Sequence, residues 1–148
     1  MEDGEKISHS LNAYQLKEQA LCIADRLRSL LEPRQRVLLL FNNGLDFIVN
    51  FFGCLYADLI PVSGVYPDAI DSKKRCSTIV RDAKPSAILG LRNTLSDFYT
   101  EKKQIDKNVI WISSEFENKK SIYFNIINKN QEEIAFIQYT SGTTNVPK

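Results

Sequence analysis

The run at residues 37–41, Val-Leu-Leu-Leu-Phe, is the feature that most limits the possible folds. It has the length of one strand and carries no alternating polar residues, so both of its faces require burial. Strands of this kind occur in parallel sheets that helices cover on both sides. Because helical patterns separate most of the strand-length apolar runs, we predict an α/β fold with a doubly wound, mainly parallel sheet. The other candidate strands lie at residues 59–62, 86–89, 109–112 and 134–139.

The segments between the candidate strands carry helical spacing. Asn12 and Gln15 have the spacing of a capping box, and apolar residues then recur every three or four positions up to residue 30. A second apolar stripe covers residues 76–83. A short helix is expected around residues 95–98, capped by Asn93 or Thr94.

Residues 45–57 are apolar in nearly every direction around a helix. The longest apolar stretch, near residues 45–60, is interrupted by Asn50 and Asp58 and is shorter than the ~20 residues that cross a bilayer. It therefore predicts a core helix and no transmembrane segment. Since a helix of this kind needs cover on more sides than 148 residues readily provide, we expect the isolated chain to expose an apolar patch there.

The bulk composition excludes several classes of function. Nineteen basic and eighteen acidic side chains leave a net charge of +1, so no nucleic-acid partner is predicted. The three cysteines lie in separate segments, without a Cys-x-x-Cys pair, so no metal site is predicted. The first ten residues contain no apolar run that would form a secretory signal. These features favour a cytoplasmic location.

The candidate strand at residues 134–139 leads directly into Thr-Ser-Gly-Thr-Thr-Asn-Val-Pro-Lys at residues 140–148. A polyphosphate is bound by backbone N–H groups, hydroxyls and a cation at close range. Gly142 permits close backbone approach, the Thr and Ser residues offer hydroxyls, and Lys148 offers positive charge. The loop is not of the Walker type, because a proline and not a glycine precedes the lysine. We expect the strand to lie inside the sheet, with Thr140 leaving its carboxyl end, where such sheets bind ligands.

The ten residues 139–148 resemble the phosphate loop of the adenylate-forming, or AMP-binding, superfamily. Asn145 stands where that family usually has glycine, and asparagine tolerates the left-handed backbone region. The resemblance extends over nearly the whole chain, although Ala13 and Asp58 replace the usual tyrosine and glycine. It is most specific for the amino-terminal part of the fatty acyl-AMP ligases and long-chain acyl-CoA synthetases, at residues 36–41, 44–48 and 52–57.

The resemblance implies ATP- and Mg²⁺-dependent conversion of a long-chain fatty acid to acyl-AMP, with transfer of the acyl group to an acyl carrier protein or to coenzyme A. Residues 1–148 would form the amino-terminal part of the adenylation domain and end at the phosphate loop. By matching position, the contacts to the ATP phosphates would be Thr140, Ser141, Gly142, Thr143, Thr144 and Lys148.

No catalytic residue is assigned within this chain, because the family's adenine-binding segment, ribose-binding aspartate, magnesium-associated glutamate, acyl tunnel and carboxyl-terminal lysine fall outside the matched region. The chain is therefore expected to be an amino-terminal fragment that is inactive alone. The alternative is a truncated or degenerate, non-catalytic module that binds a partner chain. Neither the acyl chain length nor the acceptor is encoded in the residues present.

Overall fold

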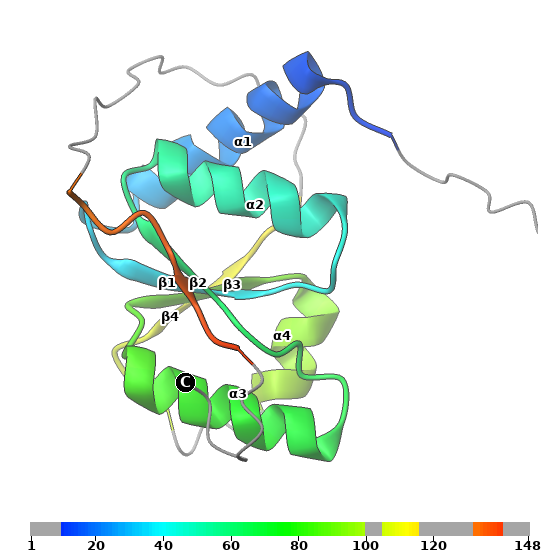
Figure 1. Cartoon of the computed structure of the whole chain (residues 1–148), viewed down its shortest axis with the longest axis vertical. Coiled ribbons are helices and arrows are strands. Elements are labelled where there is room, and N and C mark those ends of the chain that lie inside the picture. The colour runs from blue at the N-terminus through cyan, green and yellow to red at the C-terminus, as the bar shows by residue number, and fades with distance from the viewer. Residues whose placement is uncertain (1–9, 100–104, 116–131, 141–148) are drawn as a thin grey trace, which may run out of the picture.

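The computed structural model describes residues 10–99, 105–115 and 132–140, which form one parallel sheet covered by helices (Figure 1). The five strands follow the order β4-β3-β1-β2-β5, and every neighbouring pair is parallel. The strands are β1 Arg36–Leu40, β2 Ile60–Ser63, β3 Ala87–Gly90, β4 Ile110–Ser113 and β5 Ile137–Gln138. The helices are α1 Ala13–Arg28, α2 Leu45–Tyr56, α3 Ile70–Ala83 and α4 Arg92–Tyr99. The prediction of a parallel α/β fold is confirmed.

The sheet is wound on both faces. Helices α1 and α2 cover one face, and α3 and α4 cover the other (Figure 1). Strand β1 lies in the middle and divides its side chains between two apolar clusters: Val37 and Leu39 join the α1/α2 cluster, and Leu38 and Leu40 join the α3/α4 cluster. All four are at most 5% exposed. This is the double burial that the run at residues 37–41 predicts.

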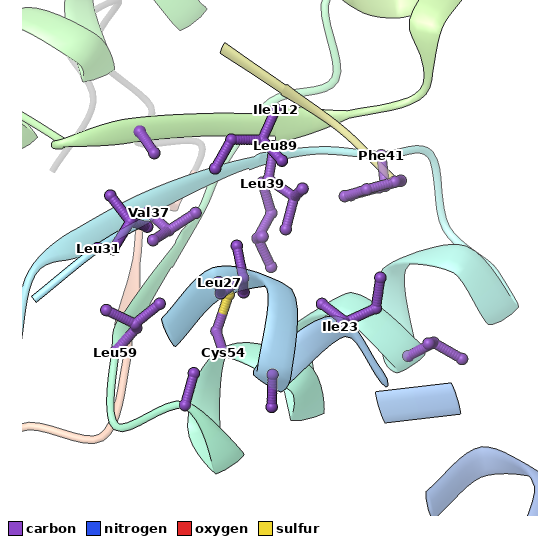
Figure 2. Close-up of a cluster of buried hydrophobic side chains, with 14 residues drawn as sticks. Ile23, Leu27, Leu31, Val37, Leu39, Phe41, Cys54, Leu59, Leu89 and Ile112 are labelled. Carbon is purple, nitrogen blue, oxygen red and sulfur yellow. The ribbon is translucent and has the colours of Figure 1, made fainter. Parts of the chain in front are cut away.

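The α1/α2 cluster depends on a close approach of the two helices. Figure 2 shows Ile23 and Leu27 of α1 and Cys54 of α2 pointing toward the side chains of the sheet. Gly53 lies at the helix contact, and a Cβ atom added there would sit 2.5 Å from Cγ2 of Ile23. The glycine therefore permits the helices to pack closely enough to seal the core beneath them.

Two predicted helix starts have different outcomes. The capping box is confirmed: Gln15 N–H donates to Asn12 Oδ1 at 2.8 Å, and Asn12 N–H donates to Gln15 Oε1 at 3.0 Å. The predicted cap of the short helix is wrong, because α4 begins at Arg92 and so places both Asn93 and Thr94 inside its first turn. Thr94 is instead buried, and its hydroxyl lies 3.0 Å from the hydroxyl of Tyr66.

Helix α2 confirms the predicted core helix and shows how incomplete its cover is. Val49 and Cys54 are buried, whereas Ile48 and Phe52 are each 39% exposed. Asn50, which interrupts the apolar run, is fully buried; its amide donates to the Asp46 carbonyl at 2.8 Å, and its Oδ1 accepts from Ser114. Within the described residues, no helix has the length and apolar character needed to cross a membrane.

Strand β5 departs from its prediction. The run at residues 134–139 was expected to lie inside the sheet, but only Ile137–Gln138 pair, and they pair with β2 alone at the edge of the described sheet. Ile134 is 58% exposed and Phe136 is 47% exposed. Only the two residues Ile137–Gln138 of the predicted run form a strand, because apolar residues favour burial but do not supply a second neighbouring strand.

Candidate phosphate-binding edge

All five strands are parallel, so their carboxyl ends meet at one edge of the sheet. The connection after β1 leads to α2 on one face, whereas the connections after β2 and β3 lead to α3 and α4 on the opposite face (Figure 1). Neighbouring connections that leave toward opposite faces mark a topological switch point, the usual ligand site of an open α/β sheet. The switch point lies at β1, and the candidate site lies at the same edge, where β2 separates β5 from β1.

Thr140 is the part of the predicted loop that the structure describes. It is exposed and follows the carboxyl end of β5, as predicted. The other five predicted phosphate contacts lie at residues 141–148, outside the described residues. The start of the predicted loop thus lies at the edge of the sheet that carries the carboxyl ends of the strands.

Tyr139 fixes the chain immediately before Thr140. Its N–H donates to the carbonyl of Ser63 at 2.9 Å, which extends the β2–β5 pairing by one bond. Its hydroxyl donates a hydrogen bond to the carboxylate of Asp82 on α3. Burial, together with the hydrogen bond and negative charge of Asp82, raises the pKa of Tyr139 to about 12, although the positive charge of Arg36 acts in the opposite direction. The phenol is therefore held as a neutral hydrogen-bond donor at neutral pH.

Sequence reasoning missed this pair. The sequence places Tyr139 at the end of a strand and at the start of the loop motif but assigns it no partner, and Asp82 lies 57 residues earlier in the chain. No spacing rule connects residues so far apart. The one available signal is that Tyr139 is the first residue of the loop motif and carries a hydroxyl that its neighbours Ile137 and Gln138 do not.

A second side chain secures the segment that leads into β5. Arg34 has a left-handed backbone, with φ of 66°, and its N–H donates to the Asp58 carbonyl at 2.7 Å. Its guanidinium donates to the Ile134 carbonyl at 2.8 Å. The same guanidinium lies 3.6 Å from the Asp58 carboxylate and 3.8 Å from that of Glu133. Arg34 therefore joins the turn before β2 to the segment before β5.

Two other features bear on ligand binding. Among the described residues, no group of three or more His, Cys, Asp or Glu side chains is arranged to hold a metal ion. A hollow of about 710 Å³ opens near Gln35, Lys84 and Ser86, at the amino ends of the strands. It lies at the edge opposite Thr140, so it is not the predicted phosphate site.

Comparison with known proteins gives a consistent result. Residues 5–148 match the family model described as AMP-binding enzyme. The chain is 35% identical to a medium-chain fatty acid–[acyl-carrier-protein] ligase, JamA, of Moorena producens, an alignment that covers all of this chain and 26% of that protein. It is 32% identical to the long-chain fatty acid–AMP ligase FadD23 of Mycobacterium tuberculosis, over 98% of this chain and 25% of that one.

Solved structures show the same likeness. The crystal structure of a fatty acid AMP ligase from Legionella pneumophila matches with a TM-score of 0.82 and 32% identity, over 95% of this chain and 24% of that one. A Legionella pneumophila fatty acyl-adenylate ligase in complex with acyl adenylate and pyrophosphate matches with a TM-score of 0.78 and 32% identity, over 97% and 25% of the two chains. The chain thus spans about a quarter of the length of these relatives.

Proposed function

The chain belongs to the AMP-binding enzyme family, and from this premise we propose that it is the amino-terminal part of an enzyme that activates a fatty acid as acyl-AMP. The observation that carries the proposal is the position of Thr140. The motif that resembles a phosphate loop begins where β5 ends, at the edge of the sheet where ligands bind. The names of the relatives support a fatty acid as the substrate.

The residues of the loop suit the phosphates of ATP. Thr140, Ser141, Thr143 and Thr144 supply hydroxyl donors, Gly142 allows the backbone to approach the phosphates, and Lys148 supplies a positive charge. The described geometry fits this use, because Thr140 is exposed and leaves the carboxyl end of a parallel strand. Bound Mg²⁺ would neutralise part of the phosphate charge. The contribution of this chain is to hold the phosphates in place for attack on the α-phosphate.

We propose that the chain alone does not form acyl-AMP. It spans about a quarter of its relatives, and adenylation needs the carboxylate, the α-phosphate and a neutralising group at near-attack distance together. A misplacement of about 1 Å can cost ~100-fold in rate. Transfer of the acyl group to a carrier protein or to coenzyme A belongs to the complete enzyme, whose location we propose to be cytoplasmic.

A non-catalytic module that binds a partner chain is the second candidate. Ile48 and Phe52 of α2 favour it, because each is 39% exposed on a helix whose apolar residues face nearly every direction. The coding sequence downstream of Lys148 separates the two candidates. An in-frame adenine-binding motif and terminal lysine domain would support the enzyme, and their absence would favour the module.

Nucleotide binding by the chain is tested directly by titrating it with ATP and Mg²⁺ and following amide signals by NMR. We expect weak, salt-sensitive shifts at positions 140–148 that Lys148→Ala removes. Lys74→Ala is the matched control, because Lys74 is an exposed lysine on α3 and far from the motif in sequence. The assignment of residues 140–148 as a phosphate loop would be contradicted if the unaltered chain showed no shifts. It would also be contradicted if Lys148→Ala and Lys74→Ala showed equal shifts.

Catalysis is tested by pyrophosphate exchange with a panel of fatty acids of increasing length, beside a complete relative. We expect exchange at the level of the enzyme-free blank for this chain. Fatty-acid-dependent exchange that is lost in Lys148→Ala would overturn the proposal that the chain is inactive alone.

A further inference from the structure

The strand that carries the candidate loop has little backbone pairing of its own. Strand β5 is two residues long, pairs with β2 only among the described strands, and is preceded by the exposed apolar residues Ile134 and Phe136. A strand so short and so exposed contributes few hydrogen bonds that could fix where the next residue lies. The place of Thr140 must therefore depend on contacts beyond the sheet ladder.

Tyr139 adds one bond to the β2–β5 ladder and makes two side-chain contacts outside it. Its N–H bonds the end of β2 through the Ser63 carbonyl at 2.9 Å. Its hydroxyl bonds Asp82 near the end of α3. Its Cβ packs over Gly64, where an added Cβ atom would sit 3.6 Å away. The position is thus fixed along the sheet, across to the helix and against the backbone of the following loop.

We infer that Tyr139 and Asp82 are positioning residues that set where the phosphate loop begins. The inference rests on the proposed function, because it gives the first residue of the loop motif a task distinct from contact with phosphate. The hydroxyl bonds an anionic acceptor, and charge-assisted hydrogen bonds of this kind are stronger than neutral ones. The tyrosine ring packs against the α3/α4 cluster, while its hydroxyl reaches a side chain at the surface.

A simpler role for Tyr139 is to cover the apolar cluster beneath it. The ring alone would serve that role, whereas positioning of the loop also requires the hydroxyl group. Tyr139→Phe keeps the ring and removes the hydrogen bond. Tyr14→Phe is the matched control, because Tyr14 is 72% exposed on α1 and its hydroxyl makes no bond to Asp82.

Hydrogen exchange of the amide at position 139 measures the positioning directly. We expect Tyr139→Phe and Asp82→Ala each to speed this exchange roughly 3- to 10-fold, in line with the usual net worth of one hydrogen bond. The amides of β1 should keep their rates, because the core is untouched. The double variant should be no faster than either single variant, since both remove the same bond.

Three results would overturn the inference. They are unchanged exchange at position 139 in Tyr139→Phe, a change that spreads equally to β1, or additive effects of the two substitutions. Addition of ATP and Mg²⁺ to the same samples separates this inference from the proposed function. Absence of nucleotide shifts in the unaltered chain counts against the function and leaves the exchange result standing. Normal nucleotide binding with unchanged exchange counts against the positioning role alone.

Discussion

Strand β1 and the β5 segment, residues 132–140, are held in the fold by different means. Strand β1 has a neighbour on each side and apolar side chains in both clusters, all at most 6% exposed over residues 37–41. The β5 segment has one neighbouring strand and keeps Ile134 and Phe136 exposed. Its polar contacts come from Arg34 before the strand and Tyr139 after it, and its apolar contacts include Phe136 against Phe51 and Ile137 against the α3/α4 cluster.

The contrast between β1 and the β5 segment distinguishes contacts that stabilise the fold from contacts that position a particular residue. Burial of apolar surface is strong and does not depend on direction, so it secures β1 without specifying any one atom. Hydrogen bonds contribute less free energy but require defined geometry. We therefore expect the segment that bears the candidate loop to contribute less to the stability of the fold than β1 does, and its polar contacts to determine where the loop begins.

Matched isoleucine truncations should show the largest contrast. Ile88 on β3 is fully buried, and Ile134 is 58% exposed. We expect Ile88→Ala to lower the free energy of unfolding by about 2–5 kcal/mol through lost burial and a cavity. Ile134→Ala should change it by less than about 0.5 kcal/mol. Urea unfolding followed by circular dichroism measures both changes. Similar losses of stability would contradict the distinction between the buried strands of the sheet and the β5 segment.

Matched glycine substitutions should give a smaller contrast. A Cβ atom at Gly53 would lie 2.5 Å and 2.8 Å from Cγ2 and Cβ of Ile23, and the latter atom cannot move without the helix. At Gly64, beside Tyr139, the close atom is the terminal Cδ1 of Ile79, which can turn aside. We expect Gly53→Ala to cost about 1–3 kcal/mol, and Gly64→Ala less than about 1 kcal/mol. Equal shifts in the urea midpoint would contradict the close packing of α1 on α2.

The centre of the fold follows from the sequence more directly than its edge does. The run at residues 37–41 predicts double burial, and Asn12 and Gln15 predict their cap, because each signal is local and has one physical cause. The edge position of β5 was not predictable in this way. Apolar character at residues 134–139 requires cover but does not say which strand provides it.

The candidate site likewise has some features that the local sequence predicts and others that depend on the folded sheet. The motif placed Thr140 at the end of a strand, since a strand followed by a loop is a local pattern. The bond from Tyr139 to Asp82 joins segments that only the folded sheet brings together, as does the bond from Arg34 to Ile134 across 100 residues. The cap of α4 was missed because Thr94 bonds Tyr66 and does not begin the helix.

Glycine substitutions at two left-handed positions should differ by about 1 kcal/mol. Lys84 and Arg34 have φ values of 46° and 66°, a region that glycine occupies without strain. Lys84 ends α3, so we expect Lys84→Gly to raise the free energy of unfolding by about 1 kcal/mol. Arg34→Gly relieves the same strain but loses the bond to Ile134 and the ion pairs, so we expect no gain. An equal gain at both positions, measured by urea unfolding, would show that Arg34 does not secure the β5 segment.

The smallest expected effect is on proton binding. The pKa of Cys76 is raised from 9.0 to about 12 by burial alone, and that of Tyr139 is raised from 10.0 to about 12 by burial and by Asp82, against Arg36. Both folded values lie above the unfolded ones, so the neutral groups favour the folded state fully below pH 9 and pH 10 respectively, and this contribution is lost as the pH rises toward 12. The two groups differ in cause: one belongs to the core, and the other depends on a contact at the edge. Asp82→Ala should therefore lower the pKa of Tyr139 and leave that of Cys76 unchanged.

Phenolate absorbance, taken as the difference from Tyr139→Phe in the same background, measures the titration of the tyrosine. The rate of alkylation of Cys76 measures the titration of the thiol. An unchanged tyrosine titration in Asp82→Ala would show that burial alone sets it, and that the hydroxyl of Tyr139 is not held by α3.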